Sequence, residues 1–546
     1  MMFSHHFEFS HRKDAIGFLS KNDKNTLDFL VVDSVEEKRV VGNVYSNLKE
    51  FMDEIPKCAN CFKFFIVNLF GLPSDTVTGE TPYSFCKELK KKFKELKIPS
   101  YFISTENCLF STLLIAASVD VKVDEKIFLI LPHGPWNDNQ SDTFGLSVGE
   151  FKFTLNGFQQ LRFETLPSLN FKENPEILCE QICGTKTPRK VYSASFGPKK
   201  NPLKKIFKPN SLTLLNCCIR CHLDRYLLQT CKWFFDKTLI KYHVIPTVAK
   251  GIHIYANYGS EENILEILKI NICDSLPLSK TAVFTKSFPQ IMISLEDDVF
   301  KKYVVPKTLT KDCHRYQVTV TIDEENMDMI KFEKLEINNF NDLLLTADKM
   351  MKAKIPLIGF FYNSSIIGIY ESSKESYEFM EEWNGCYGID CFISFDQKRP
   401  KFGEKALEAL QTKNTCVDFD LLKILSMPPE EIKIETSWGF TFTNNDENPI
   451  LLEFDTFKGT QMASSPTFLM AMFLRQHLKA IEAKIGEKTK KIGLWIFEDL
   501  FDETQMARIK NGLEEACKLI KIDCIFIDNE NFVADFIVSD ITEFNI

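Results

Sequence analysis

The stretch that decides the fold is the C-terminal run Met472–Gly486 (MFLRQHLKAIEAKIG) with the sequence that follows it. Leu478, Ile481 and Ile485 recur at helical spacing, so this run predicts an amphipathic helix. A strand, a second helix and a second strand are expected next, at 491–497, 502–520 and 522–527. Alternating helices and strands of this kind indicate an α/β protein with mixed sheets.

The same order of elements is expected near the N-terminus. Its helices and strands fall at 44–55, 62–69, 82–96 and 98–103. Lys97-Ile98 matches Lys521-Ile522, and Glu106-Asn107 matches Glu530-Asn531 at the same offset. Any two such units share some likeness, but these matches favour a true duplication in which 472–531 repeats 44–107. Repeats have to be found before a fold is assigned.

The overall composition is typical of a soluble globular protein of several domains. The chain has 546 residues, of which 44% are hydrophobic and 26% charged, and its net charge is -9 at pH 7. This acidic balance argues against a dedicated nucleic-acid binder, whose surface is basic. No apolar leader opens the chain, no run approaches the length of a membrane span, and the 17 cysteines are scattered. We therefore expect a cytoplasmic protein that binds neither nucleic acid nor membrane.

Two apolar runs, 126–131 (KIFLIL) and 356–370, are expected to lie in sheet cores. Both are too continuously apolar to be half-exposed strands. Alternation in 316–322 (YQVTVTI) predicts a small β unit. Helices are expected at 223–235, 245–255 and 338–354, and 149–211 reads as an excursion rich in loops.

Several motifs resemble the seventy-kilodalton heat-shock protein family, the chaperones with an actin-like ATPase domain. In the middle of the chain, 214–220 (LLNCCIR) is similar to the family's adenosine motif LVGGSTR, and 274–279 (DSLPLS) to DVTPLS. Segments 246–251 and 300–307 resemble the neighbouring family sequences. In the C-terminal section, the similar segments are 358–365 (IGFFYNSS, where the family has its first phosphate loop), 392–396, 402–406, 437–440 and 496–505. Their order along the chain is the specific part of the resemblance.

The resemblance implies actin-like, ribonuclease-H-like lobes with a shortened β segment like the family's substrate-binding domain. The halves are in an unusual order. The expected parts are an N-terminal extension (1–41), a degenerate second half of the ATPase domain (42–285), a shortened β domain (286–337), a helical spacer (338–354) and a degenerate first half (355–546). The chain would be either two partial copies or a circular permutant, in which 355–490 and 110–290 form one ATPase domain.

An actin-like ATPase needs carboxylates around Mg²⁺ and glycine-rich loops around the phosphates. The carboxylate of the first loop corresponds to Phe361 here, and the second loop corresponds to 130–135 or 143–145, which contain no carboxylate. The vestigial nucleotide-site positions that the resemblance implies are Ser364, Ser365, Gly134, Glu106 and Arg220. We expect no catalytic residue, no metal site and no cofactor, with ATP and Mg²⁺ only if the nucleotide site is retained.

Two cysteine clusters have spacings that redox or zinc sites use. Cys58 and Cys61 form one pair, without a second pair to complete a zinc site. The denser cluster consists of Cys217, Cys218, Cys221 and His222. Because these residues follow an expected strand, we expect them to be packed rather than to bind a metal.

The resemblance implies a divergent relative of the chaperone family that has become a pseudo-ATPase. Such a protein would act as a binding or regulatory module in protein folding and quality control, with unfolded polypeptides or co-chaperone-type proteins as partners. Two alternatives stay open. One is an active ATP-dependent chaperone of unfolded polypeptides, and the other is a structural or interaction protein without a ligand.

Overall fold

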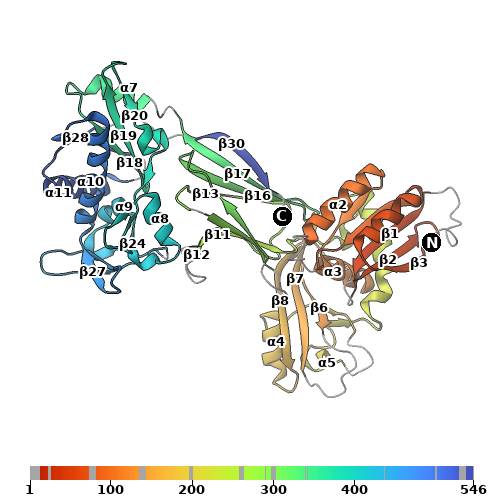
Figure 1. Ribbon diagram of the computed structural model, residues 1–546. Helices are drawn as coiled ribbons and strands as arrows, with labels where there is room; N and C mark the ends of the chain where they lie inside the picture. The colour runs from red at the N-terminus through yellow and green to blue at the C-terminus, as the bar shows by residue number, and fades with distance from the viewer. Residues whose placement is uncertain are drawn as a thin grey trace.

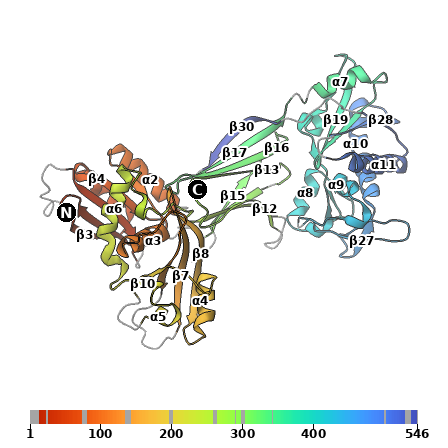
Figure 2. The same cartoon turned by 180° about the vertical axis from the view of Figure 1, so that it is seen from behind.

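The chain folds into two α/β regions with a β-sandwich between them (Figures 1 and 2). The computed structural model describes residues 13–22, 26–72, 81–133, 143–195, 201–257, 264–288, 290–296, 303–338, 340, 342–435, 437–497, 501–527 and 536–544. We call 13–249 the N-terminal region and 342–527 the C-terminal region. Both views place the sandwich between the two regions, so the molecule is elongated.

The N-terminal region begins with a sheet of five strands. Their order is β3 (Lys38–Tyr45), β2 (Leu27–Asp33), β1 (Ala15–Lys21), β4 (Phe62–Asn68) and β5 (Ser100–Phe102). β1, β2 and β3 form an antiparallel meander, whereas β4 and β5 run parallel to β1. Parallel neighbours need crossover connections, and α1 (Leu48–Glu54) and α2 (Pro82–Glu95) supply them. The Asn47 and Thr81 side chains cap these two helices by accepting backbone N–H groups.

A second sheet of five strands follows in the same region. Its order is β10 (Leu212–Leu214), β9 (Val191–Ser193), β6 (Lys126–His133), β7 (Thr143–Thr154) and β8 (Gly157–Asn170). Here too a meander, β6 to β8, is extended by two parallel strands. The helices α4 (Pro175–Cys183) and α5 (Leu203–Ile206) lie between β8 and β10 in the chain. Two further helices, α3 (Thr105–Ala116) and α6 (Leu223–Phe235), pack on the first sheet through Cys108, Ile115 and Tyr226.

The β-sandwich has two sheets of four strands. One has the order β12 (Ile264–Ile270), β11 (Gly251–Asn257), β14 (Gln290–Glu296) and β15 (Tyr303–Thr308), and the other β13 (Leu278–Thr285), β16 (Arg315–Ile322), β17 (Asp328–Ile337) and β30 (Phe536–Phe544). β16 alternates between buried and half-buried residues along its length, as the sequence predicted for 316–322. β30 pairs antiparallel with β17, so the chain returns from the C-terminal region to complete the sandwich (Figure 1).

The C-terminal region is built around a third sheet. Its main path is β20 (Ser376–Phe379), β19 (Ser364–Glu371), β18 (Leu357–Phe361), β28 (Lys491–Ile496) and β29 (Asp523–Phe526), and β21 (Ile389–Asp390) also pairs with β19. The helices α7 (Asp342–Met350), α10 (Pro466–Ile485) and α11 (Glu503–Leu519) belong to this region. Between β20 and α10 lies an insertion with α8 (Glu404–Leu410), α9 (Leu421–Ser426) and short strands that include β22 (Ile393–Ser394) and β24 (Val417–Asp418).

The mixed α/β class is confirmed, and so are the buried strands at 126–131 and 356–370. Segments 44–107 and 472–531 share helix–strand–helix–strand connectivity, and in each the two parallel strands extend a meander in the same order. Leu48 and Leu478 are both half-buried against the main apolar core. Residues 126–214 have the same strand order, a third occurrence that the sequence did not indicate.

Three expectations about the division of the chain differ from the structure. Residues 1–41, expected as an extension, contain β1 and β2, and β1 is the central strand of the first sheet. The β unit starts at Gly251 rather than at 286, and among the described residues it has eight strands, including β30 from the end of the chain. The circular permutant is wrong, because the sandwich separates 355–490 from the sheet of 126–214 (Figures 1 and 2).

Two local expectations were also wrong. Residues 245–255 were expected to be helical, but 251–257 form β11, since a short apolar run fits a buried strand as well as a helix. Residues 149–211 hold the long strands β7 and β8 and helix α4 rather than loops. By contrast, the helix predicted at 223–235 has those bounds in the structure. Buried side chains of the first sheet, the sandwich and the C-terminal region, such as Phe65, Ile293 and Phe419, belong to one continuous apolar cluster.

Candidate functional site

A cleft of about 860 Å³ lies between the β-sandwich and the C-terminal region. This volume falls in the range of pockets that hold small molecules or short chain segments, about 300–1,000 Å³. The sandwich lines it with residues of β12, β13, β16 and the segment after β13: Glu266, Val283, Phe284, Phe288 and Arg315. The C-terminal region lines it with Tyr362, Asn363, Phe392, Phe419, Asp420, Lys423, Glu431, Lys433, Glu435, Ser437, Phe501, Gln505 and Arg508, among others.

Residues from separate motifs meet in this cleft. Tyr362 and Asn363 belong to 358–365, Phe392 to 392–396, Ser437 to 437–440, and Phe501 and Gln505 to 496–505. These are four of the five C-terminal segments that resemble the chaperone family. Segments far apart in the chain therefore converge at the end of the β18–β19 hairpin.

The turn between β18 and β19 forms one wall of the cleft. Its first residue, Tyr362, has a positive φ of 49°, a conformation that a large side chain rarely adopts. Asn363 Oδ1 accepts the backbone N–H of Asp420 at 3.0 Å, which ties the turn to the insertion. Asn363 Nδ2 is buried and has no hydrogen-bond partner among the described residues. The turn therefore holds a buried, unpaired amide donor close to the cleft.

Arg315 connects the opposite wall to this turn. Its guanidinium carbon lies 4.1 Å from the centroid of the Tyr362 ring, which is a cation–π distance. Its Nε atom is buried and, like Asn363 Nδ2, makes no hydrogen bond within the described part of the chain. Both atoms are covered from solvent in this conformation, so each is a buried donor that costs stability.

A partly buried carboxyl, that of Asp420, lies at the start of α9. Trp438 Nε1 donates to Asp420 Oδ2 at 3.0 Å. Burial raises the pKa of Asp420, and the tryptophan hydrogen bond and the charge of Lys423 oppose this shift. Lys423 is itself paired with Glu435 at 2.5 Å on the exposed rim. The cleft thus combines aromatic surface with acidic and basic groups, a lining suited to binding a polypeptide segment or a polar small molecule.

The predicted serines lie close to this cleft but do not open into it. Ser364 is 4% exposed, and its hydroxyl donates to Asp390 Oδ1 at 2.7 Å. Asp390 is also paired with Lys311 at 2.9 Å. Ser365 is fully buried, with its Oγ 2.8 Å from His477 Nε2. Both hydroxyls therefore have partners inside the protein.

The remaining predicted positions are far from these serines. Glu106 lies in the first turn of α3, and Arg220 is exposed in the 3₁₀ turn η4 (Ile219–His222). Both belong to the N-terminal region, on the other side of the sandwich (Figure 1). Gly134 lies outside the described residues. Of the predicted positions that the structure describes, Glu106 and Arg220 therefore lie in one region and Ser364 and Ser365 in the other.

Phe361 occupies the position where the resemblance places a phosphate-loop carboxylate. It is 1% exposed. The rings of His314, Phe340 and Phe497 surround it, with centroids 5.5–5.9 Å away. The Lys286 ammonium also faces this ring, with Nζ 5.9 Å from the Phe361 centroid. Aromatic rings and a lysine do not fit a Mg-nucleotide, which needs carboxylates at this position.

The two cysteine clusters differ in exposure. Cys58 and Cys61 are half-buried, and burial raises the pKa of both thiols. Cys217, Cys218 and Cys221 are exposed, so the expected packing of this cluster is wrong. The cluster lies in a loop and a 3₁₀ turn after the last strand of the second sheet, outside its core. In the described residues, no group of His, Cys, Asp and Glu has a geometry that could hold a metal ion.

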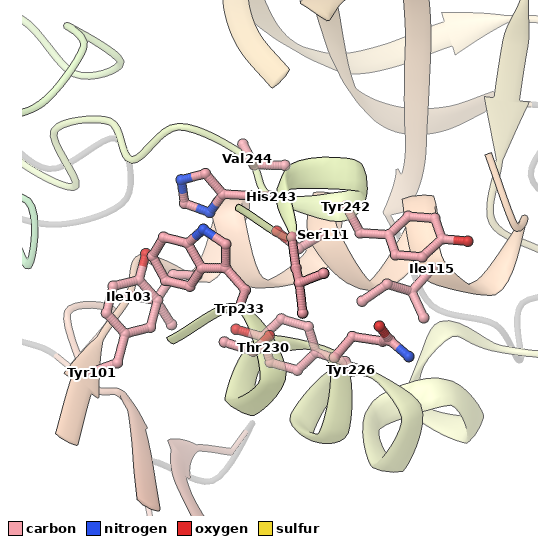
Figure 3. Close-up of a pocket in the computed structure, with 12 residues that line it drawn as sticks. Tyr101, Ile103, Ser111, Ile115, Tyr226, Thr230, Trp233, Tyr242, His243 and Val244 are labelled. Carbon is pink, nitrogen blue, oxygen red and sulfur yellow. The ribbon is translucent and has the colours of Figure 1, made fainter. Parts of the chain in front are cut away.

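A small second cavity lies between α3, β5 and α6 in the N-terminal region. Figure 3 shows the side chains that line it, among them Trp233, His243 and Tyr226. Its volume is about 30 Å³, which is room for roughly one water molecule. The rings of Trp233 and His243 are stacked with centroids 3.9 Å apart, and burial lowers the pKa of His243 to about 3. This is a packing junction with a neutral histidine.

Arg315, Tyr362 and Asp420 line the cleft and Trp438 hydrogen-bonds to Asp420, and sequence reasoning missed all four as site residues. Arg315 comes from the sandwich and meets the others only through the tertiary fold. Within the described chain, no helix has both the length and the apolar character needed to cross a bilayer. The sequence matches no protein-family model and no curated protein.

Proposed function

We propose that this chain is a divergent, rearranged relative of the seventy-kilodalton chaperone family, whose α/β regions are degenerate actin-like lobes. It would act in the cytoplasm as a pseudo-ATPase, a binding or regulatory module in protein folding and quality control. The strand order of the three large sheets supports this proposal, since each is a three-stranded meander extended by two parallel strands. The convergence of four motif segments on one cleft is the observation that carries it.

Loss of ATP hydrolysis is supported by Phe361. Hydrolysis in an actin-like site depends on carboxylates that position Mg²⁺ and its water shell. Phe361 lies in an aromatic cluster instead. The Ser364 hydroxyl donates to Asp390, and the Ser365 hydroxyl is hydrogen-bonded to His477. Losing one transition-state contact costs a factor of about 10²–10³ in rate, so several losses leave turnover near background.

A binding role is supported by the make-up of the cleft. Val283 is 44% exposed on the sandwich wall, and Phe501 is half-exposed on the facing wall. Arg315 and Asn363 add polar side chains to these walls. Apolar walls with a few polar groups are typical of ligand sites, and aromatic-lined grooves also bind extended peptides. Unfolded polypeptides and co-chaperone-type proteins are therefore the proposed partners.

The experiment is suppression of aggregation of a chemically denatured model protein, measured by light scattering with and without Mg-ATP. We expect suppression that does not depend on ATP. Val283→Glu should weaken it, because the substitution places a charge on the exposed apolar wall of the cleft. Val123→Glu is the matched control, since Val123 is equally exposed (45%) but does not line the cleft.

Each alternative makes a different prediction in this assay. Suppression that requires ATP turnover would favour an active chaperone and contradict the pseudo-ATPase. No suppression by the wild-type protein would favour a structural protein without a ligand. Equal losses in Val283→Glu and Val123→Glu would show that binding occurs outside the cleft.

A further inference from the structure

The exposed thiols of this protein are concentrated in one place. Of the 17 cysteines, three are exposed, and all three fall within 217–221. They lie between β10 and α6, in the turn η4 and the residues before it. The other cysteines are buried or half-buried. A thiol reagent in solution would therefore meet this segment first.

The turn holds two of these thiols in contact. Cys218 Sγ and Cys221 Sγ are 3.2 Å apart, because a 3₁₀ turn brings residues three apart onto the same face. A disulfide has an S–S distance of about 2.05 Å, so the two sulfurs need to approach by only about 1 Å. Cys217 Sγ lies 3.1 Å from His222 Nε2, and its thiol also interacts with Cys221. The two sulfurs that the turn places 3.2 Å apart, and that we consider for a disulfide, are those of Cys218 and Cys221.

The surroundings give the two thiols different roles. The hydrogen bond from the Cys221 thiol lowers the pKa of Cys218, helped by the backbone N–H groups of Cys221 and Arg220 and by the Arg220 charge. The same pairing raises the pKa of Cys221. Because the thiolate is the nucleophile in thiol chemistry, Cys218 is the attacking group and Cys221 the resolving one.

Cys58 and Cys61 show that spacing alone does not produce this arrangement. They have the same two-residue separation, but burial raises the pKa of Cys58 to about 12. Its thiol donates to the Ile55 carbonyl oxygen at 3.5 Å rather than contacting Cys61. Cys58 and Cys61 therefore serve as an internal comparison for Cys218 and Cys221.

We propose that Cys218 and Cys221 form a thiol–disulfide exchange site that reacts with low-molecular-weight disulfides. The Cys218 thiolate attacks one sulfur of RS–SR, the S–S bond breaks, RS⁻ leaves, and a mixed disulfide forms on Cys218. Cys221 then loses its proton and attacks the Cys218 sulfur, which releases the second RS⁻. The two cysteines are oxidised by two electrons, RS–SR is reduced, and the two thiol protons end on two RSH molecules. This site is independent of the proposed polypeptide-binding function.

The test uses the full-length protein and glutathione disulfide as the probe. After quenching with an alkylating reagent, peptide mapping by mass spectrometry should find a disulfide between Cys218 and Cys221, an alkylated Cys217 and an alkylated Cys58. Dithiothreitol should reduce the disulfide between Cys218 and Cys221. Cys221→Ser should stop the reaction at a glutathione adduct on Cys218. Cys218→Ser should slow glutathione incorporation into this segment by about tenfold or more, because the more acidic thiol is lost.

Cys58→Ser is the matched control and should behave as the wild-type protein does. The proposal is overturned if the wild-type protein forms the Cys58–Cys61 disulfide first, or if glutathione stops at Cys217. It is also overturned if the purified protein holds one equivalent of Zn²⁺ that protects the three thiols from reagent. The peptide map of the wild-type protein tests the proposal without any substitution. A variant that folds poorly therefore leaves this test intact.

Discussion

The guanidinium carbon of Arg315 lies 4.1 Å from the centroid of the Tyr362 ring, across the boundary between the β-sandwich and the C-terminal region. Arg315 is the first residue of β16, and Tyr362 is the first residue of the turn between β18 and β19. Further contacts cross this boundary, among them those from Lys286 to the Tyr387 carbonyl oxygen and from Lys311 to Asp390. The position of the turn, and hence the shape of the cleft, is thereby coupled to the sandwich.

This coupling can be measured with a double-mutant cycle of Arg315→Ala and Tyr362→Ala. A cation–π pair that is partly desolvated contributes about 0.5–2 kcal/mol, so the double variant should lose less stability than the sum of the two single variants by that amount. The free energy of unfolding is measured by urea denaturation. As a control, Arg315→Ala combined with Tyr370→Ala should be additive, because Tyr370 is paired with Lys354 instead. Additivity in the first cycle would show that the contact carries no energy.

A second prediction concerns Phe361. Phe361→Asp should not produce ATP hydrolysis above background, and it should destabilise the C-terminal region by more than the cost of about 3–5 kcal/mol for a buried Phe→Ala change. The added cost is that of a carboxylate buried among Phe340, Phe497 and His314, which the Lys286 ammonium offsets only in part. Phe361→Leu, which keeps the site apolar, should cost much less. Turnover in a phosphate-release assay by a folded Phe361→Asp protein would contradict this.

The sequence predicted those elements whose hydrophobic pattern lies within one short segment. The helix at 223–235 has the expected bounds, and β6 and β18 contain continuous apolar runs, which are typical of buried strands. The helix–strand–helix–strand connectivity of 44–107 and 472–531 followed from the matches between those two segments. What could not be predicted depends on partners distant in sequence. β30 pairs with β17, a strand about two hundred residues earlier, and the sequence pattern of β30 does not indicate this partner.

The candidate site was only partly predictable for the same reason. The motif segments indicated that 358–365 and 496–505 matter, and they do line the cleft. The sequence alignment could not show that Ser364 and Ser365 point to Asp390 and His477, nor that Arg315 arrives from the sandwich. The exposure of Cys217, Cys218 and Cys221 was also misjudged, since the end of a short strand can lie inside or outside the core.

A third prediction concerns β30. A chain that ends at residue 535 should still fold, but the backbone groups of β17 that pair with β30 lose their partners. Amide hydrogen exchange in 328–337 should become faster by about tenfold or more, because the strand becomes an edge that opens locally. The exposed edge should also promote self-association. Ile541→Thr is the control, since Ile541 is 50% exposed and the substitution leaves the backbone pairing intact. Unchanged exchange in 328–337 would mean that β30 does not hold the sandwich.

The last prediction concerns the pH dependence of stability and rests on Asp418. This residue of β24 is fully buried, and neither of its carboxylate oxygens has a hydrogen-bond partner within the described residues. Burial alone therefore raises its pKa well above the ordinary value of 3.8.

Because the folded state binds this proton more tightly than the unfolded state, the folded state is favoured at low pH. The contribution is fully present below pH 3.8, and it is lost progressively as the pH rises from there toward the raised pKa of the folded protein. Asp418→Asn, which mimics the protonated form, should remove this loss of stability with rising pH. Its free energy of unfolding should be close to that of the wild-type protein at low pH and higher at pH 7, measured by urea denaturation across the range. Asp446→Asn, at an exposed position, should follow the wild-type curve. A variant Asp418→Asn that is less stable than the wild-type protein at pH 7 would mean that the carboxylate is charged in the folded state and has a compensating partner.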